Sequence, residues 1–474
     1  MQDRELCYLP AVEALELFRS RSLSPRELLE ALIGRTEEVE PKINAFTERY
    51  FEEALGKAAE AERRYAAGEA RPLEGLPVAI KDEPEIRGKR TTQGSLVLKD
   101  YVSEESAYVV DRLEQAGAIV HARTTTPEFC LLFQTFSRLW GVTRNPWNLE
   151  ITPGGSSGGS AASLAAGTTT LASGSDIGGS IRQPASMCGL VGYKPPYGRN
   201  PESPPFNLDS FNHQGPLART VADCALMQNA MSGPHPRDIA TVRPGIEIPL
   251  QLDTDLRGWR IAYSLDLGYV DVDAEICDHT LEVLEIFRDR GASVEEVKLP
   301  WTPRIDEIAV RYYEFMMGGY IADLVRGQED LLSDYTRDYL IRGRSVGSQE
   351  YLEALTMCGR MYDDFGPLME RNDLFVCPTI ATTRIKADFN YLHDTLEVNG
   401  KPIEPELGVS LCHQFNMLSR CPTLAVPAGT ASNGVPTGVQ LVGRTYDDVT
   451  VFRAGAALEA ERPRFRDDAS RPAL

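Results

Sequence analysis

The sequence lacks an apolar stretch that could export the protein or hold it in a membrane. Its first residues, MQDRELCYLP, are charged and do not resemble the apolar core of a signal peptide. The longest uncharged run, 151–175, approaches the length of a membrane span, yet it contains Pro153 and six glycines. We therefore expect a protein that is neither exported nor inserted into a membrane.

Paired cysteines and nucleotide-binding glycines are also missing. The nine cysteines are scattered from Cys7 to Cys421 without a C-x-x-C pair, which argues against a zinc site or a redox motif. No G-x-G-x-x-G follows an expected strand, so dinucleotide binding has no support. Scattered cysteines and the lack of an export signal predict a cytoplasmic location with reduced thiols.

A basic segment of any length is absent as well. The formal net charge is -20, from 49 Lys and Arg against 69 Asp and Glu. Such a surface repels phosphate backbones and anionic membranes, so we expect no nucleic acid partner and no membrane partner. With 42% hydrophobic and 25% charged residues, the composition is otherwise that of an ordinary globular protein.

The first 70 residues predict a helical arm. Ser24 to Glu27 form a capping box with proline at the first helical position, which predicts a helix that runs to about Glu40. Residues 51–67 are rich in Ala, Glu and Arg and predict a second helix. We expect residues 1–70 to pack on a core domain formed by residues 71–474.

Short apolar runs alternate with helical patterns in the rest of the chain. Residues 76–80, 106–116 and 118–120 have the order strand, helix, strand, and the order recurs at 260–263, at a helix that Gly291 ends, and at 292–294. Residues 305–363 are mostly helical in pattern, and further strands are expected at 374–377, 423–426 and 438–442. This pattern predicts one α/β/α domain with a mixed, largely parallel central sheet that helices cover on both faces.

Two glycine-serine segments carry the chemical information. They are TPGGSSGGSAASLAAG, residues 152–167, and GSDIGGSIRQPASMCG, residues 174–189. Glycines let backbone amides approach a substrate, and a serine beside free N–H groups can act as a nucleophile that faces an oxyanion hole. One such loop alone is usually a connector. Here a predicted helix of small residues, 160–166, follows the first glycine-serine loop and ends at Gly167. This favours a structured site over a flexible connector.

A serine nucleophile needs a base, and histidine is the usual one. None of the six histidines stands in a motif that marks a catalytic base. Lys81 follows an apolar strand, where burial would disfavour its charged form and leave an amine that can accept a proton. A lysine in this position is normally a solvated side chain. Only its combination with the serine segments makes it a candidate base.

The segments GLPVAIKD, TPGGSSGGSAA and GSDIGGSIRQPASMCG resemble, in order and spacing, the three sequence blocks of the amidase signature family. The resemblance implies a triad of Lys81 as base, Ser156 as proton relay after a cis peptide bond, and Ser180 as nucleophile. It also implies that Asp176 and Arg182 support the nucleophile loop. The oxyanion hole falls on the backbone N–H groups of Ile177, Gly178, Gly179 and Ser180. The mechanism implied needs no cofactor and no metal.

The resemblance extends over nearly the whole chain, including GAIVHARTTTPEF, CPTLAVPAG and VPTGVQLVGRTYDD. Two places depart from the family pattern. Arg123, Thr124 and Thr125 stand where the family usually has Lys-Thr-Asn, and 420–422 reads Arg-Cys-Pro where Gly-Gln-Pro is common. Neither departure falls on the three residues of the implied triad.

The resemblance implies an amide hydrolase that cleaves a C–N bond through an acyl-enzyme on Ser180, giving a carboxylic acid and ammonia or an amine. The substrate is expected to be a small amide. Aromatic and apolar residues cluster at 129–140 and again at 312–317, and we expect some of both sets, Phe129 and Phe133 among them, to form an apolar substrate pocket. A homo-oligomer is compatible with the sequence.

Three alternatives stay open at this stage. Residues 155–159 satisfy G-x-S-x-G, which would make Ser157 the nucleophile of an α/β-hydrolase-type esterase, although 147–153 makes a poor preceding strand. A second reading is an amidotransferase A-type subunit that supplies ammonia from glutamine. The nearest counterpart of the arginine-rich segment of such proteins is 341–345. The third is a non-catalytic scaffold, which the presence of all three triad residues disfavours.

Overall fold

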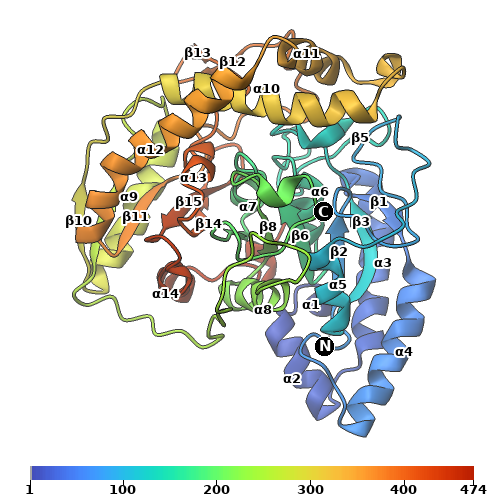
Figure 1. The fold of residues 1–474 in the computed structure, drawn as a ribbon. Helices are drawn as coiled ribbons and strands as arrows, with labels where there is room; N and C mark the ends of the chain where they lie inside the picture. The colour runs from blue at the N-terminus through green and yellow to red at the C-terminus, as the bar shows by residue number, and fades with distance from the viewer. Residues whose placement is uncertain (1–2) are drawn as a thin grey trace.

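An 11-stranded mixed sheet forms the centre of the computed structural model, which describes residues 3–474 (Figure 1). The strand order is β1-β3-β2-β6-β8-β7-β14-β15-β11-β9-β10. The strands are β1 Phe46–Arg49, β2 Pro77–Lys81, β3 Ile119–Thr124, β6 Leu171–Ser175, β7 Val191–Lys194, β8 Gln214–Ala218, β9 Arg260–Tyr263, β10 Ser293–Glu296, β11 Leu374–Pro378, β14 Thr423–Thr430 and β15 Pro436–Val442. Two small hairpins, β4 Phe136–Ser137 with β5 Gly141–Val142 and β12 Leu396–Val398 with β13 Lys401–Ile403, lie outside it.

Parallel pairing occupies two blocks of this sheet. β2 pairs in parallel with β3 and β6, and β9 pairs in parallel with β10 and β11. Between the blocks, β6, β8, β7, β14, β15 and β11 pair antiparallel in turn, and β1 adds an antiparallel edge. The mixed α/β architecture expected from the sequence is confirmed, with its parallel part at the strand-helix-strand repeats that predicted it.

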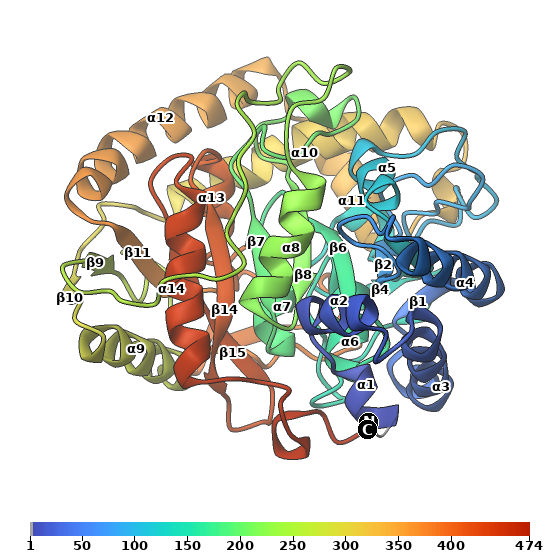
Figure 2. The ribbon, with the colours of Figure 1, turned by 90° about the horizontal axis from the view of Figure 1, so that it is seen from below.

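Helices cover both faces of the sheet. On one face α5 Tyr108–Gln115, α8 Val221–Met231, α14 Asp448–Glu461 and α9 Ala274–Asp289 form a row in which each helix contacts the next (Figure 2). On the other face α6 Gly158–Ala166 and α7 Arg182–Cys188 lie against the central strands. The expected layering by helices on both faces is therefore confirmed.

Glycines in the strands let α7 approach the sheet closely. A Cβ added at Gly192 of β7 would lie 2.7 Å from Ala185 Cβ, and one added at Gly438 of β15 would lie 2.8 Å from Ser186 Oγ. On the opposite face of the sheet, the side chain of Leu424 in β14 packs against α14. Because α7 is held against the sheet, the loop before it is fixed in place.

The N-terminal segment forms α1 Asp3–Cys7, α2 Ala11–Ser20, α3 Pro25–Ile43 and α4 Phe51–Ala67. The capping box of Ser24 and Glu27 begins α3 as the sequence predicts, with Glu27 N donating to Ser24 Oγ at 3.1 Å. The segment also supplies β1, an edge strand that its helical pattern did not predict. Tyr8 stacks on Phe465 at 5.9 Å between ring centroids, which ties the first residues to the last part of the chain.

A second apolar core lies under α10 Arg304–Leu324, α11 Asp334–Gly343 and α12 Ser348–Arg371, which cross the top of Figure 1 above β11 and the short helix α13 His413–Met417. These three helices account for the mostly helical pattern expected at 305–363. Among residues 3–474 no helix is both long enough and apolar enough to cross a membrane.

Candidate active site

Lys81 is the last residue of β2, and its side chain is fully buried. Its Nζ donates to Ser156 Oγ and to Ser175 Oγ, each at 2.8 Å. Because β2 and β6 are parallel, Lys81 and Ser175 meet at the carboxyl ends of neighbouring strands. In the part of the chain that the structure describes, Nζ forms no ion pair with a carboxylate.

The adjacent carboxylate, Asp82, is bound elsewhere. Arg123 Nη2 lies 3.2 Å from Asp82 Oδ1, and Thr92 N donates to the same oxygen at 2.9 Å. Burial raises the pKa of Asp82 above its ordinary value, although the charge of Arg123 acts to lower it. The arginine that replaces the family's usual lysine at 123 is therefore the buried counter-ion of Asp82, and Asp82 does not neutralise Lys81.

Ser156 lies in the loop that leads into α6, and the Gly155–Ser156 peptide bond is cis. The backbone N of Ser157 donates to Ser180 O at 3.1 Å, which joins the two serine loops directly. A Cβ at Gly159 would lie 2.4 Å from Thr125 N, so only glycine lets α6 start this close to the end of β3. Ser156 is completely buried from bulk solvent.

Ser180 lies between β6 and α7, in a loop organised by Asp176 and Arg182. Arg182 Nη2 donates to Asp176 Oδ1 at 2.8 Å and Nε donates to Oδ2 at 2.9 Å, and neither side chain is exposed. Burial acts to raise the pKa of Asp176, but the charge and hydrogen bonds of Arg182 outweigh it, so the pKa lies below its ordinary value. Asn416 Nδ2 also donates to Asp176 Oδ1 at 2.8 Å. The loop therefore folds around the Asp176–Arg182 ion pair, in which both carboxylate oxygens of Asp176 accept hydrogen bonds.

The four backbone amides expected to form an oxyanion hole differ in their bonding. Gly179 N donates to Asp176 Oδ1 at 2.8 Å, so this amide is already occupied. The amides of Ile177, Gly178 and Ser180 have no hydrogen-bond partner within residues 3–474. The role of Gly179 lies in its backbone conformation, with φ at +128°, and in its lack of a side chain. A Cβ there would lie 2.6 Å from Cys412 Cβ.

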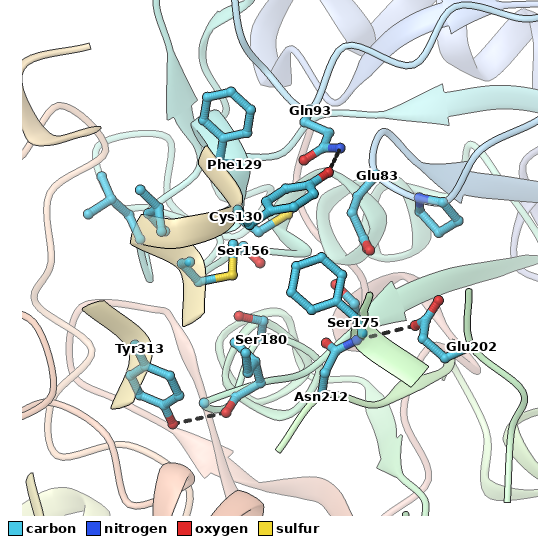
Figure 3. A pocket seen from close by; sticks show the side chains of 18 of the residues that line it. Glu83, Gln93, Phe129, Cys130, Ser156, Ser175, Ser180, Glu202, Asn212 and Tyr313 are labelled. Carbon is cyan, nitrogen blue, oxygen red and sulfur yellow. Dashed lines mark hydrogen bonds between the residues drawn. The ribbon is translucent and has the colours of Figure 1, made fainter. Parts of the chain in front are cut away.

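A cavity opens above these groups and contains both Ser156 and Ser180 on its lining (Figure 3). Phe129 and Phe133 line it, as do Leu131 and Leu132 of the same cluster. From the later cluster, Tyr313 and Met317 of α10 line it, whereas Tyr312, Phe315 and Met316 do not. Tyr313 OH also donates to Ile177 O at 2.9 Å and so fixes the nucleophile loop from above.

The other wall of the cavity is polar. It includes Glu83, Glu202 and Asn212, which Figure 3 shows across the cavity from Phe129 and Tyr313. Asn212 Nδ2 donates to Glu202 Oε2 at 3.2 Å, and Ser203 N donates to Glu202 Oε1 at 2.8 Å. Burial first, and then the charge of Glu83, raise the pKa of Glu202 well above that of an ordinary glutamate.

Sequence reasoning missed several of these polar groups. Ser175 stood in the second glycine-serine segment, but the segment alone did not indicate that it contacts Lys81. Glu83 follows Lys81 by two residues, and that spacing was a usable signal that it could reach the same site. Glu202 lies in an irregular, proline-containing segment, 199–213, where no periodicity could predict its position.

The described residues contain no group of three or more His, Cys, Asp or Glu side chains arranged to hold a metal ion. Ser157, the alternative nucleophile, is fully buried, does not line the cavity, and donates from Oγ to Ser175 O at 3.3 Å. The segment that would precede it, 147–153, forms only isolated bridges and no strand. This placement argues against a nucleophile elbow at Ser157.

Comparison with known proteins gives consistent matches over the full length. A family model described as Amidase matches residues 27–452. The A-type subunit of a glutamyl-tRNA(Gln) amidotransferase of Geobacter metallireducens is 33% identical over 96% of this chain and 97% of its own. An acylamidase of Rhodococcus erythropolis is 34% identical over 98% of this chain and 97% of its own. The crystal structure of a bacterial aryl acylamidase superposes with a TM-score of 0.90 at 29% identity, covering 96% of both chains.

Proposed function

The chain belongs to the amidase signature family, and on that premise we propose that it hydrolyses a small-molecule amide through an acyl-enzyme on Ser180. The products are a carboxylic acid and ammonia or an amine. Lys81 acts as the base, Ser156 relays the proton, and neither a metal nor an organic cofactor takes part. We place this activity in the cytoplasm, where nine scattered cysteines would stay reduced.

One observation carries the proposal: the 2.8 Å contact between Lys81 Nζ and Ser156 Oγ, on a lysine that has no carboxylate partner in the described chain. A lysine that served as a structural cation would be expected to have an anion beside it. Lys81 instead meets two serine hydroxyls at the floor of a cavity that Ser180 also lines. This is the arrangement that a proton relay requires.

In the acylation step, Ser180 Oγ attacks the amide carbonyl carbon and the C=O π electrons move to oxygen. The hydroxyl proton of Ser180 passes to Ser156 Oγ as Ser156 gives its own proton to the uncharged Lys81 amine. The unpartnered amides of Ile177, Gly178 and Ser180 donate to the oxyanion. We leave Gly179 out of the hole because its amide is bound to Asp176.

Collapse of the tetrahedral intermediate breaks the C–N bond, and the leaving nitrogen takes a proton back through Ser156. Water then attacks the carbonyl carbon of the acyl-Ser180 ester while the same relay accepts its proton. The second tetrahedral intermediate collapses, the C–Oγ bond breaks, Ser180 Oγ regains a proton through Ser156, and the carboxylic acid leaves. Asp176 and Arg182 support the loop and touch no reacting atom. Their buried, bidentate contact keeps the amides of the loop oriented before substrate binds.

The apolar wall is proposed to bind the non-reacting part of the substrate. Phe129, Phe133, Tyr313 and Met317 give this side of the cavity an apolar surface. Aryl or medium-chain acyl amides should therefore be better substrates than acetamide. Much faster hydrolysis of acetamide would contradict this part of the proposal.

A second candidate function is the supply of ammonia from glutamine to partner chains. The observation that favours it is the 33% identity to the glutamyl-tRNA(Gln) amidotransferase chain of Geobacter metallireducens over nearly the whole sequence. Against it, the segment nearest to the arginine-rich part of such proteins, at the end of α11, is engaged within this chain. Arg342 there is paired with Glu314, Asp338 and Glu406.

The decisive experiment uses a fluorophosphonate probe and mass spectrometry. The adduct should map to Ser180, Ser180→Ala should abolish labelling, and Ser156→Ala should slow labelling without moving the adduct. An adduct on Ser156 or Ser157 would overturn the assignment. In parallel, purified protein should hydrolyse aryl and acyl amides alone, and rapid hydrolysis of free glutamine with no activity on those amides would favour the second candidate.

A further inference from the structure

The polar wall of the cavity contains two carboxyl groups that the proposed mechanism does not use. Glu83 follows Lys81 closely in the chain, and Glu202 comes from the irregular segment 199–213 (Figure 3). The Gln214 carboxamide links Glu83 to the start of β8, since Gln214 Nε2 donates to Glu83 Oε1 at 3.2 Å. Both carboxyls line the space in which a substrate would lie.

Among the described residues no cation pairs with either carboxyl group. Other acids near the site have arginine partners: Asp82 has Arg123 and Asp176 has Arg182. Within residues 3–474 neither Glu83 nor Glu202 forms an ion pair. A further acid, Asp238, lies close to Glu202 instead, and its Oδ2 accepts from Glu202 N at 3.0 Å.

A hydrogen-bond acceptor in this wall is also left over. Glu83 Oε2 is buried and accepts no hydrogen bond from the described residues. The same holds for Oε1 of its partner Gln214, which does not itself line the cavity. A buried acceptor without a donor is costly, and the cost disappears if a bound group supplies N–H donors. A group that carries a positive charge and N–H donors would therefore complement this wall.

We propose that Glu83 and Glu202 bind a protonated amine of the substrate, so that the preferred substrates are small amides that carry an ammonium group. An ammonium has three N–H donors and one positive charge, and this wall offers the unpartnered Glu83 Oε2 and two carboxyl groups that form no ion pair within residues 3–474. The apolar wall opposite, at Phe129 and Tyr313, accommodates the carbon chain between the ammonium and the amide. This substrate class rests on the proposed amide hydrolase function.

The test compares matched substrates that differ only in the terminal group. ω-Aminoacyl 4-nitroanilides of three chain lengths are paired with acyl 4-nitroanilides in which a methyl group replaces the ammonium. Acetyl amides of a diamine and of the matching monoamine cover the case in which the ammonium is on the leaving side. The wild-type protein should prefer one ammonium series by about tenfold or more in kcat/KM, which corresponds to one charge-assisted contact.

The variants Glu83→Gln and Glu202→Gln should lower kcat/KM for the ammonium substrate to within a few-fold of the neutral one. The readout is the ratio of kcat/KM for the two substrates, so a loss that affects the neutral anilide equally is a general loss of activity and counts against the subsite. Glu105→Gln is the matched control, because it removes an acidic charge from an exposed pair with Arg237 that does not line the cavity. It should leave the preference unchanged.

Equal rates for ammonium and neutral substrates, or a preference that both glutamine variants retain, would overturn the subsite. A calorimetric comparison of butylammonium and butanol binding separates this outcome from failure of the proposed function, because it needs no turnover. Tighter binding of butylammonium that Glu83→Gln and Glu202→Gln abolish would support the subsite even in a protein that hydrolyses neither anilide. Labelling of Ser180 without any such binding would leave the hydrolase function standing and reject the subsite.

Discussion

Acidic side chains beside the same cavity differ in the charge of their hydrogen-bond partners. Asp176 is completely enclosed and receives donors from Arg182, Asn416 and the Gly179 amide. Glu202 and Glu83 receive donors only from neutral groups and line the cavity. In the first case the fold supplies the counter-charge, and the group shapes a loop. In the second no cation among the described residues pairs with the carboxyl group, which is the basis of the proposed ammonium subsite.

Lys81 is the basic counterpart of the second case. It is as buried as Arg182, yet it contacts two hydroxyls where Arg182 contacts a carboxylate. Under the proposed mechanism, charge matching separates the residues that build the site from those that act in it. Substitutions at Lys81, Arg182, Glu83, Ser175 and Glu202 test this separation, because each shows whether structure or chemistry is lost.

The largest effect is expected at Lys81. Lys81→Ala should reduce kcat by about a thousandfold or more, because it removes the proposed proton acceptor. Lys81→Arg should be nearly as inactive, since a guanidinium keeps its proton at any working pH. The measurement is kcat on an aryl amide, with thermal unfolding to check that both variants fold. A Lys81→Arg enzyme with near wild-type turnover at neutral pH would reject the base role.

Breaking the Asp176–Arg182 ion pair should lower the stability of the fold more than it lowers the rate of catalysis. Arg182→Met leaves the Asp176 carboxylate buried without its counter-ion, and breaking a buried pair in this way costs about 3–5 kcal/mol of unfolding free energy. Urea unfolding measures the loss. Glu83→Gln, which removes an unmatched charge, should leave the urea midpoint unchanged or higher. If the two variants lose equal stability, the distinction between matched and unmatched acids is wrong.

The sequence predicted the fold best where local signals agree with the final structure. The capping box at Ser24 and the alternation of 76–80 with 118–120 predicted α3 and the parallel pair β2 and β3. β6 was missed because its sequence, LASGS, has little strand propensity, and its pairing depends on neighbours β2 and β8. Strand pairing between distant segments overrode local preference there.

The same contrast between local sequence signals and long-range contacts holds for the site. Lys81, Ser156 and Ser180 could be proposed because each stands in a short block whose residue types suggest chemistry. Glu202 could not be proposed, because only the folded chain brings its irregular segment beside Glu83. The occupied amide of Gly179 was equally inaccessible, since it depends on how Asp176 turns within the loop. Motifs therefore predict reacting groups better than they predict the walls around them.

A smaller effect on chemistry is expected from Ser175→Ala. The change removes one of the two hydroxyls that hold Lys81 Nζ, and it should lower kcat by about tenfold, the cost of roughly one hydrogen bond. Ser163→Ala is the matched control, because Ser163 is also buried and its Oγ donates only within α6, to Ser160 O at 2.9 Å. A similar loss of kcat in both variants would mean that Ser175 acts through general stability and not through Lys81.

The last prediction concerns the pH dependence of stability, whose sign differs between Glu202 and Asp176. Burial and the charge of Glu83 raise the pKa of Glu202 to about 8, so the folded protein holds its proton more tightly than the unfolded chain does. The contribution of Glu202 to stability is therefore present at acidic pH and lost as pH rises toward about 8. For Asp176, whose pKa is lowered, the contribution is present at neutral pH and lost as pH falls through acidic values.

Subtracting the unfolding free energy of Glu202→Gln from that of the wild-type protein at several pH values isolates the contribution of Glu202. The difference should decrease from about pH 5 to about pH 8, and a flat or rising difference would show that Glu202 is not part of an unmatched acid pair.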